Sequence, residues 1–353
     1  MEYIYDYGLF LAQAGTIVAA ILIVVGGIVA MGQRQKAEHE GHIEIKHLNE
    51  KYDDIREIIE EVVSDEETLK SEAKLKKKEA KREAKEAKKQ RKAAAGGESV
   101  PGKGRLYVLE FDGDIKASAA DNLREEISAV LPQVREGDEI LVKLESPGGM
   151  VHSYGLASSQ LKRITDAGVP LTVAVDKVAA SGGYMMACVA DKILAAPFAV
   201  LGSIGVLAQL PNFHKLLKKN DIDFELLTAG EYKRTLTMFG ENTDKGREKF
   251  VEELEQTHDL FKEFVGANRP QLDVDKVATG EVWYGIRALD EGLIDELQTS
   301  DAYVQDKLKD VDVFEVKFVH KKNWQEKMGM AAEGALEKAF LKIWQRAQQR
   351  NSY

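Results

Sequence analysis

Cysteine is almost absent from this 353-residue chain, which contains only Cys188. A single cysteine excludes a disulfide framework and a zinc site built on cysteines. The chain also lacks HExxH or other paired metal-ligand spacings, GxGxxG and a Walker loop, so we expect no metal and no cofactor. Its 59 acidic residues against 49 basic ones argue against a nucleic-acid partner.

Charge is absent from residues 8–31, a run of 24 residues whose only polar side chains are Gln13 and Thr16. About 20 apolar residues are needed to cross the hydrocarbon core of a membrane. A cleaved signal peptide begins with basic residues, whereas this chain begins MEYIYDYG. We therefore predict that residues 1–32 form a retained transmembrane anchor, with membrane lipid as the partner of residues 8–31.

The next segment, residues 33–100, is separated by charge sign. It has 12 acidic and 3 basic residues from Glu38 to Glu67, and 12 basic and 4 acidic residues from Lys70 to Lys92. The second half is rich in Ala, Lys and Glu, which favours helix, but it has almost no apolar face with which to build a core. We predict a charged helical or disordered linker. The alternative is a binding function, in which the basic half of the linker contacts anionic lipid headgroups.

Strand-like and helix-like segments alternate in residues 101–318. Strands are expected over Arg105–Ile115, Glu139–Gly149 and Val169–Val178. Helices are expected over Ser153–Gly168, with Ser153 as the cap and Gly168 as the stop, and over Ser181–Ile193. Strands separated by helices of this length imply crossover connections, so we predict an α/β fold.

The C-terminal segment, residues 319–353, is expected to form an amphipathic helix. Apolar residues recur there at helical spacing, at Leu336, Phe340, Ile343, Trp344 and Ala347. Such a helix would dock on the domain or on a neighbouring subunit, or it would lie on the membrane surface.

Four short motifs carry the candidate chemistry: Glu145–Gly149 (ESPGG), Ala179–Tyr184 (AASGGY), Leu201–Val206 (LGSIGV) and Thr228–Arg234 (TAGEYKR). Glycine-rich turns expose backbone N–H groups that can hold a developing oxyanion. A serine at a helix start lies in the positive end of the helix dipole. Taken singly, the motifs are also compatible with a tight turn, an N-cap serine, a sharp corner and a surface lysine.

In this order, the motifs resemble the signal peptide peptidase A family of Ser–Lys peptidases, and the late stretches Gly280–Gly285 and Ala288–Asp295 are similar to that family as well. The resemblance covers roughly residues 100–310 and implies a ClpP/crotonase-like fold. The anchor and charged linker are similar to one branch of the family, comprising bacterial inner-membrane proteases. Tyr284 and Ile286 depart from the family pattern, which often has a small polar and a charged residue there.

The resemblance also implies the roles of the site residues. Ser181 is then the nucleophile and Lys233 the general base, with oxyanion N–H groups from Gly182 and from the Gly148–Gly149 pair. Ser203 and Gly205 are expected to bind substrate. A free lysine titrates near about 10.4, so such a site must lower the pKa by about three units, which burial among apolar groups can do.

The expected function is a membrane-anchored serine endopeptidase of apolar peptides, such as signal-peptide remnants or misfolded envelope proteins. A homo-oligomer is expected from the resemblance, with the dyad formed within one subunit or between two. The positive-inside rule favours a cytoplasmic domain, but the long linker weakens the rule and the resemblance favours the periplasm. Two alternatives stay open: a non-catalytic membrane scaffold and a crotonase-type acyl-thioester enzyme.

Two further residues near the expected site attract attention. His152 follows the ESPGG turn, and the sequence leaves open whether it contacts substrate. Cys188, seven positions after Ser181, is expected to be a buried core thiol.

Overall fold

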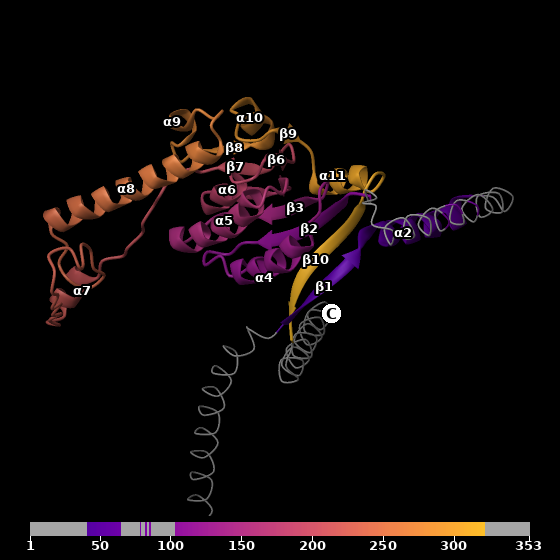
Figure 1. Ribbon diagram of the computed structural model, residues 1–353. Helices are drawn as coiled ribbons and strands as arrows, with labels where there is room; N and C mark the ends of the chain where they lie inside the picture. Colours follow the sequence, from indigo (N-terminus) through magenta and orange to yellow (C-terminus); the bar gives the residue numbers. More distant parts are fainter. Residues whose placement is uncertain (1–40, 65–77, 79–81, 83–84, 86–102, 322–353) are drawn as a thin grey trace, which may run out of the picture. The chain divides into compact units, whose positions relative to one another are not determined.

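The computed structural model describes residues 41–64, 78, 82, 85 and 103–321 (Figure 1). The predicted anchor lies outside these residues, as does the predicted C-terminal helix from residue 322 onward; its first two residues, Val319 and His320, belong to a strand instead. Among the described residues, no helix is both long and apolar enough to cross a membrane.

A seven-stranded sheet forms the centre of the fold, with the strand order β1-β10-β2-β3-β4-β6-β9. Every pairing from β10 to β9 is parallel, which confirms the predicted α/β class. The strands are β1 (Gly41–His47), β2 (Arg105–Asp112), β3 (Glu139–Glu145), β4 (Leu171–Val175), β6 (Lys192–Ala195), β9 (Glu296–Leu297) and β10 (Asp312–His320). All five residues of β4 are buried, as expected for a central strand covered on both faces.

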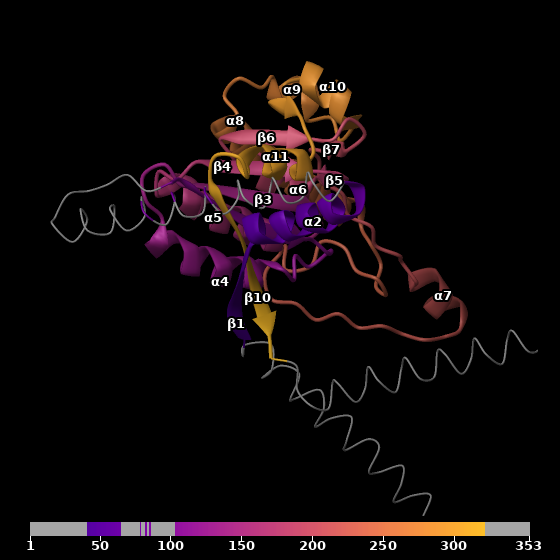
Figure 2. The same cartoon turned by 90° about the vertical axis from the view of Figure 1, so that its right-hand side faces the viewer.

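Helices cover both faces of this sheet (Figures 1 and 2). One face packs against α11 (Ser300–Lys307) through a cluster that joins Val108 and Leu141 of the sheet to Val304. The opposite face carries α4 (Ala120–Val130) and α5 (Val151–Asp166), which contribute the buried side chains of Leu123 and Leu161. The remaining helices are α2 (Leu48–Val63), η1 (Leu131–Gln133), α6 (Gly182–Ala187), α7 (His214–Lys219), α8 (Asp244–Asn268), α9 (Val274–Val277) and α10 (Gly285–Asp290).

Residues 41–63, within the segment predicted to be a charged helical or disordered linker, form β1 and α2. Leu48 is only 6% exposed and belongs to the same core cluster as Val304 and Val313. The Asn49 amide donates to Val311 O at 3.1 Å and accepts the Val313 N–H at 2.7 Å. The segment was interpreted from its many acidic residues, and its short apolar stripe was missed. The sign of the charge does not show which side of a helix packs against the domain.

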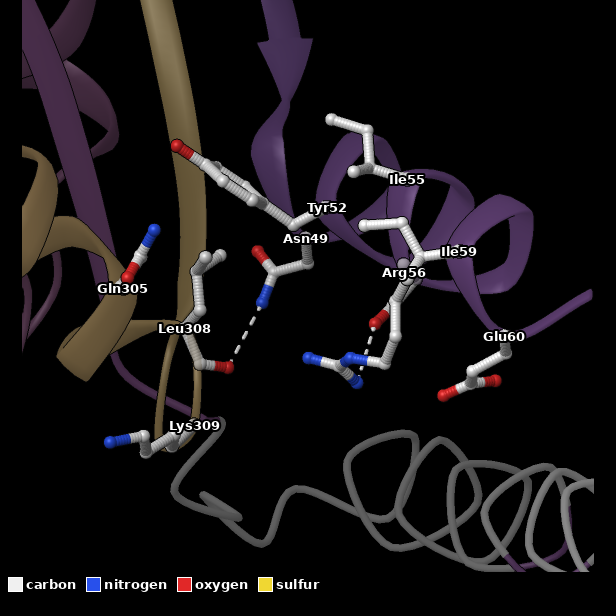
Figure 3. A pocket seen from close by; sticks show the side chains of 10 residues that line it. Asn49, Tyr52, Ile55, Arg56, Ile59, Glu60, Gln305, Leu308 and Lys309 are labelled. Carbon is white, nitrogen blue, oxygen red and sulfur yellow. Dashed lines mark hydrogen bonds and ion pairs between the residues drawn. The ribbon is translucent and has the colours of Figure 1, made fainter. Parts of the chain in front are cut away.

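Beyond this attachment, a groove of about 580 Å³ separates α2 from the end of α11 (Figure 3). Tyr52, Ile55 and Ile59 line one wall, and Leu308 lines the other. The Arg56 guanidinium lies in the groove and donates to Asp53. The lining residues of the groove include no serine, cysteine or histidine.

Each of the two predicted helices has one wrong boundary. The helix expected over Ser181–Ile193 ends at Ala187, because Lys192–Ala195 pairs with β4 as strand β6. The Asp191 carboxylate accepts the Leu171 N–H at 2.8 Å and so fixes the start of that pairing. The cap expected at Ser153 is also wrong, since α5 begins two residues earlier, after Met150, whereas Gly168 ends the helix with a φ of +72° as predicted.

Candidate active site

A second, three-stranded sheet positions the candidate nucleophile. Its strands are β5 (Val178–Ala180), β7 (Val200–Gly202) and β8 (Val282–Tyr284), in the order β5-β7-β8. β5 and β7 are parallel, and Ala180 lies opposite Gly202. The next residues, Ser181 and Ser203, therefore leave neighbouring strand ends, and the Ser181 N–H donates to Gly202 O at 2.8 Å.

Ser181 has a strained backbone. Its φ is 52° and its ψ −118°, immediately before α6 begins at Gly182. A residue other than glycine rarely adopts positive φ, and such strain persists only where the surrounding structure enforces it. Hydrogen bonds hold both sides of Ser181, since Ala180 N–H donates to Ser146 O and Met185 N–H donates to Ser181 O, each at 3.0 Å.

The ESPGG turn lies directly against Ser181. The turn is attached to β5 by the Ser146 N–H, which donates to Val178 O at 2.8 Å. Gly148 has a φ of +88°, and a methyl group on its Cα would lie 2.7 Å from the Gly182 N and 2.8 Å from the Ser181 Cβ. Only glycine fits at this position, which explains why the ESPGG motif has a glycine there.

The backbone N–H groups of this turn have different partners. The N–H of Gly148, which was expected to be an oxyanion donor, donates to Ser146 Oγ at 3.1 Å and so already has an acceptor in this structure. The Gly149 N–H has no acceptor among the described residues. Gly182 is the first residue of α6, where an N–H has no partner within the helix. Gly149 and Gly182 are therefore the donors that remain available beside Ser181.

A small, largely apolar pocket adjoins these donors. Ser181 and the three glycines Gly149, Gly182 and Gly205 form part of its wall, and Val151, Met185, Val206, Thr257 and Phe261 complete it. Its volume of about 10 Å³ is close to that of one water-sized sphere. Gly205, expected to bind substrate, lines this pocket. Ser203, expected to do the same, does not line it, and its N–H donates to Glu281 O at 2.6 Å.

Helix α8 supplies residues that sequence reasoning missed. Thr257 and Phe261 of α8 contribute to the pocket, and His258 Nε2 lies 3.2 Å from Ile204 O. The segment has no motif that indicates its contact with Ser181. The spacing of its apolar residues can predict that one face of the helix is buried, but it cannot predict that this face lies against the pocket beside Ser181.

Lys233 lies on an exposed part of the chain. The Lys233 N–H donates to Gly230 O at 3.3 Å, and its side chain is exposed. The adjacent Tyr232 ring lies 5.8 Å from Lys245 Nζ and 5.4 Å from Lys249 Nζ, near the start of α8. The residues around Lys233 are therefore associated with the first turns of this helix.

The pocket beside Ser181 contacts a later part of the same helix. From Lys249 to Thr257 the helix axis rises about 12 Å, at about 1.5 Å per residue. In Figure 1, the chain after β7 runs away from α6 to α7 before it returns along α8. In the described part of this single chain, no contact joins Lys233 to Ser181.

The other two residues singled out from the sequence have different outcomes. His152 is exposed on the first turn of α5 and is not among the residues that line the pocket. Cys188 is fully buried, as expected, and burial raises the pKa of its thiol to about 12. No group of His, Cys, Asp and Glu suited to a metal ion occurs among the residues that the structure describes.

A strained serine beside unpaired backbone N–H donors, at the edge of an α/β fold, has the parts of a serine hydrolase. Comparison with known families agrees: the chain matches the model "Peptidase family S49 N-terminal" over residues 2–161 and the model "Peptidase family S49" over residues 163–313. The chain therefore belongs to peptidase family S49 and is a serine protease. The family membership predicted from the motif order is confirmed, and neither the scaffold nor the acyl-thioester alternative is supported.

The chain is also similar to individual proteins. The chain is 52% identical over 329 residues to the "Probable protease SohB" of Haemophilus influenzae, an alignment that covers 93% of this chain and 92% of the relative. It is 48% identical over 306 residues to the "Probable protease SohB" of Buchnera aphidicola, covering 86% and 99% of the two chains. Among solved structures, a mutant of a membrane-bound stomatin-specific protease in complex with a substrate peptide is 14% identical, with a TM-score of 0.39 and coverage of 65% and 97%.

Proposed function

We propose that the chain is a membrane-anchored endopeptidase in which Ser181 is the nucleophile, Lys233 the general base, and the N–H groups of Gly149 and Gly182 the oxyanion hole. The observation that carries the proposal is the contact between strained Ser181 and the ESPGG turn. Two N–H groups without other acceptors flank one hydroxyl there, which is the arrangement that acyl transfer requires.

The reaction follows from these groups. Ser181 Oγ attacks the peptide carbonyl carbon while its proton passes to the neutral Lys233 amine. The carbonyl oxygen becomes an oxyanion between the Gly149 and Gly182 N–H groups. When the C–N bond breaks, the leaving amine takes the proton from the lysine ammonium. Water then attacks the acyl-enzyme ester, which releases the carboxylic acid and restores the Ser181 hydroxyl.

We infer that Lys233 reaches Ser181 from a neighbouring copy of the chain. The segment 207–239 that carries Lys233 exposes many apolar side chains, and Leu207 and Leu227 are 79% and 91% exposed. Apolar surface of this extent is typical of a surface that another protein covers. Burial of the segment between two copies would also favour the neutral amine that a general base requires.

Subunit mixing tests this arrangement. Full-length Ser181→Ala and Lys233→Ala chains with different tags are co-expressed, and assemblies that carry both tags are purified in detergent. Each variant alone is expected to be inactive on a quenched fluorescent peptide of alanine and leucine. The mixed assemblies should recover activity at about one quarter of the sites, the share expected for random neighbours in a ring.

The control pairs Ser181→Ala with the double variant Ser181→Ala/Lys233→Ala, which should stay inactive in every mixture. Inactive mixed assemblies of the two single variants would contradict a dyad formed between copies. Full activity of Lys233→Ala alone would reject Lys233 as the base, and activity of Ser181→Ala would reject the nucleophile.

The pocket next to Ser181 supports a substrate class of apolar peptides with a small side chain at the cleaved residue. Met185 and Phe261 limit its depth, and the Thr257 hydroxyl already donates to Glu253 O at 2.8 Å. A charged side chain would find no partner there. In a peptide series that differs only at the residue before the cleaved bond, alanine is expected to exceed lysine at least about tenfold in kcat/KM. Equal rates would contradict the assignment.

We propose that residues 8–31 span a bacterial inner membrane once and that the protease domain faces the periplasm. A single exposed cysteine tests the side of the membrane, because Cys188 is buried and its thiol has a raised pKa. Asp121→Cys, at a site 66% exposed, should react with a membrane-impermeant maleimide in intact spheroplasts. Labelling only after lysis would place the domain in the cytoplasm instead.

A further inference from the structure

One buried side chain, that of Tyr154, contacts Gly182 and is linked through Ser146 to Gly148, the residue before the second proposed oxyanion donor, Gly149. Tyr154 belongs to α5 and is fully buried, although it is not among the residues that line the pocket. Its ring lies directly beneath Gly182, because a methyl group on Gly182 would lie 2.8 Å from the Tyr154 Cβ and would collide with the ring. The ring therefore supports the backbone that presents the Gly182 N–H.

The hydroxyl of Tyr154 is linked through Ser146 to Gly148, which precedes the other donor, Gly149. Tyr154 Oη lies 2.5 Å from Ser146 Oγ, and Ser146 Oγ accepts the Gly148 N–H at 3.1 Å. Tyr154 also donates its own proton to Asp114 O at 2.7 Å. Since a hydroxyl has one proton, Ser146 must donate to Tyr154, and the series runs in one direction from Gly148 through Ser146 and Tyr154 to Asp114.

This series fixes the turn that carries Gly149. The Gly148 N–H is held by Ser146, so the peptide before Gly148 has one orientation, and the positive φ of Gly148 then directs the next peptide. A neighbouring glycine leaves room for the series: a methyl group on Gly113 would lie 2.5 Å from Ser146 Oγ and 2.6 Å from Tyr154 Oη. Burial raises the pKa of the Tyr154 phenol, so its proton stays in place above the ordinary range.

We propose that Tyr154 is a positioning residue for catalysis, which holds the Gly149 and Gly182 N–H groups at the separation that the oxyanion requires. The proposal rests on the proposed function, because it assigns Tyr154 a role in the oxyanion hole beside Ser181. Tyr154 does not touch the reacting atoms. It acts through Ser146 on one donor and through ring contact on the other.

Tyr154→Phe in the full-length chain removes the hydroxyl and keeps the ring. Because an oxyanion donor contributes about 10²–10³ in kcat, a displaced donor should lower kcat about tenfold or more and leave KM within about twofold. The rate of Ser181 labelling by a fluorophosphonate, whose P=O oxygen requires the same donors, should fall in parallel. The peptide of alanine and leucine described above is the substrate.

Tyr303→Phe is the matched control, since it also removes a buried tyrosine hydroxyl, one that bonds Glu139 on the α11 face of the sheet. It should lower the melting temperature as Tyr154→Phe does, and leave kcat unchanged. Ser146→Ala removes a smaller side chain's hydroxyl from the same hydrogen-bonded series. It replaces Tyr154→Phe as the test variant if Tyr154→Phe does not fold. The double variant Tyr154→Phe/Ser146→Ala should have about the same kcat as whichever single variant has the lower kcat, because both changes interrupt one series.

Wild-type kcat in Tyr154→Phe or Ser146→Ala, a change confined to KM, or additive losses in the double variant would overturn the positioning role. These outcomes are separate from failure of the proposed function. If Ser181→Ala remains active, the nucleophile is wrong. If Ser181→Ala is inactive while Tyr154→Phe has wild-type kcat, only the role of Tyr154 is wrong.

Discussion

Gly148 contacts Ser181 from a different strand end: a methyl group on Gly148 would lie 2.8 Å from the Ser181 Cβ and 2.7 Å from the Ala180 O. The two residues belong to separate motifs of the sequence, and each has a positive φ. The contact means that the ESPGG turn and the serine turn form one rigid unit, in which neither backbone can change without displacing the other.

Gly148→Ala should therefore abolish activity and destabilise the fold. The new methyl group meets backbone atoms that cannot rotate away, so kcat should fall by about 10²-fold or more. The free energy of unfolding should fall by about 2–4 kcal/mol. Gly168→Ala is the control, since Gly168 also has positive φ but faces open space. It should cost about 1 kcal/mol and leave kcat unchanged, as measured by urea unfolding and peptide hydrolysis.

The strain at Ser181 predicts an inverse relation between activity and stability. Glycine adopts a φ of 52° without steric conflict, whereas alanine retains the conflict. Ser181→Gly should therefore be more stable than Ser181→Ala by about 1 kcal/mol, although both are inactive. Thermal unfolding of the two variants measures the difference, and an equal or lower stability of Ser181→Gly would contradict the strain.

The Arg269–Asp295 pair predicts how stability depends on pH. Arg269 Nη2 lies 2.8 Å from Asp295 Oδ1, with the side chains 3% and 30% exposed. Burial acts to raise the pKa of Asp295, but the hydrogen bonds from Arg269 and the Ile193 N–H lower it below its ordinary value. Stabilisation from a lowered carboxyl pKa is complete above the unfolded value, near about 3.9, and is lost as pH falls through the folded value.

Asp295→Asn should therefore remove a contribution that is present at neutral pH. It leaves a buried guanidinium without its carboxylate, so the free energy of unfolding should fall by about 3 kcal/mol at pH 7. The difference between variant and wild type should shrink in acid, below about pH 4. Asp166→Asn, which breaks the exposed pair with Lys162, should change stability by less than about 1 kcal/mol. A pH-independent difference for Asp295→Asn would contradict the ion-pair origin.

Asn49 is expected to hold α2 on the domain. Its amide accepts the Val313 N–H and donates to Val311 O and to Leu308 O, so Asn49→Ala leaves three backbone groups without these partners. The expected loss is about 1–2 kcal/mol, with faster amide hydrogen exchange in α2 and at Val313. Glu57→Ala, on the exposed side of the same helix, should leave exchange at Val313 unchanged. Equal effects of the two changes would contradict the attachment.

The sequence predicts the central fold well where local pattern and burial coincide. Strands β2 and β3 begin at the predicted Arg105 and Glu139, and α5 ends where Gly168 was expected to stop it. The prediction fails for β6, where the apolar run after Ser181 suits a helix or a strand equally. There the pairing with β4, rather than local preference, decides.

The site is predicted in part. The order of the motifs indicates that Gly148 and Ser181 belong together, and the structure brings them into contact. It does not indicate that the Gly148 N–H is already held by Ser146, because this depends on the direction of one hydroxyl. The contribution of Tyr154 is equally invisible in sequence, since an aromatic residue within an amphipathic helix is typical of any core. The place of Lys233 is still a prediction that needs a second copy of the chain.

Strand β1 has a consequence for shortened forms of the chain. It is the edge of the seven-stranded sheet, and β10, nine residues long, lies behind it. A chain that starts at residue 101, where the predicted linker ends, would leave β10 as an open edge of the sheet. Such an edge recruits strands from other molecules. A soluble fragment that starts at residue 101 would thus expose β10 as a site of aggregation. A fragment that begins before Gly41 would keep β1 as the strand that covers β10.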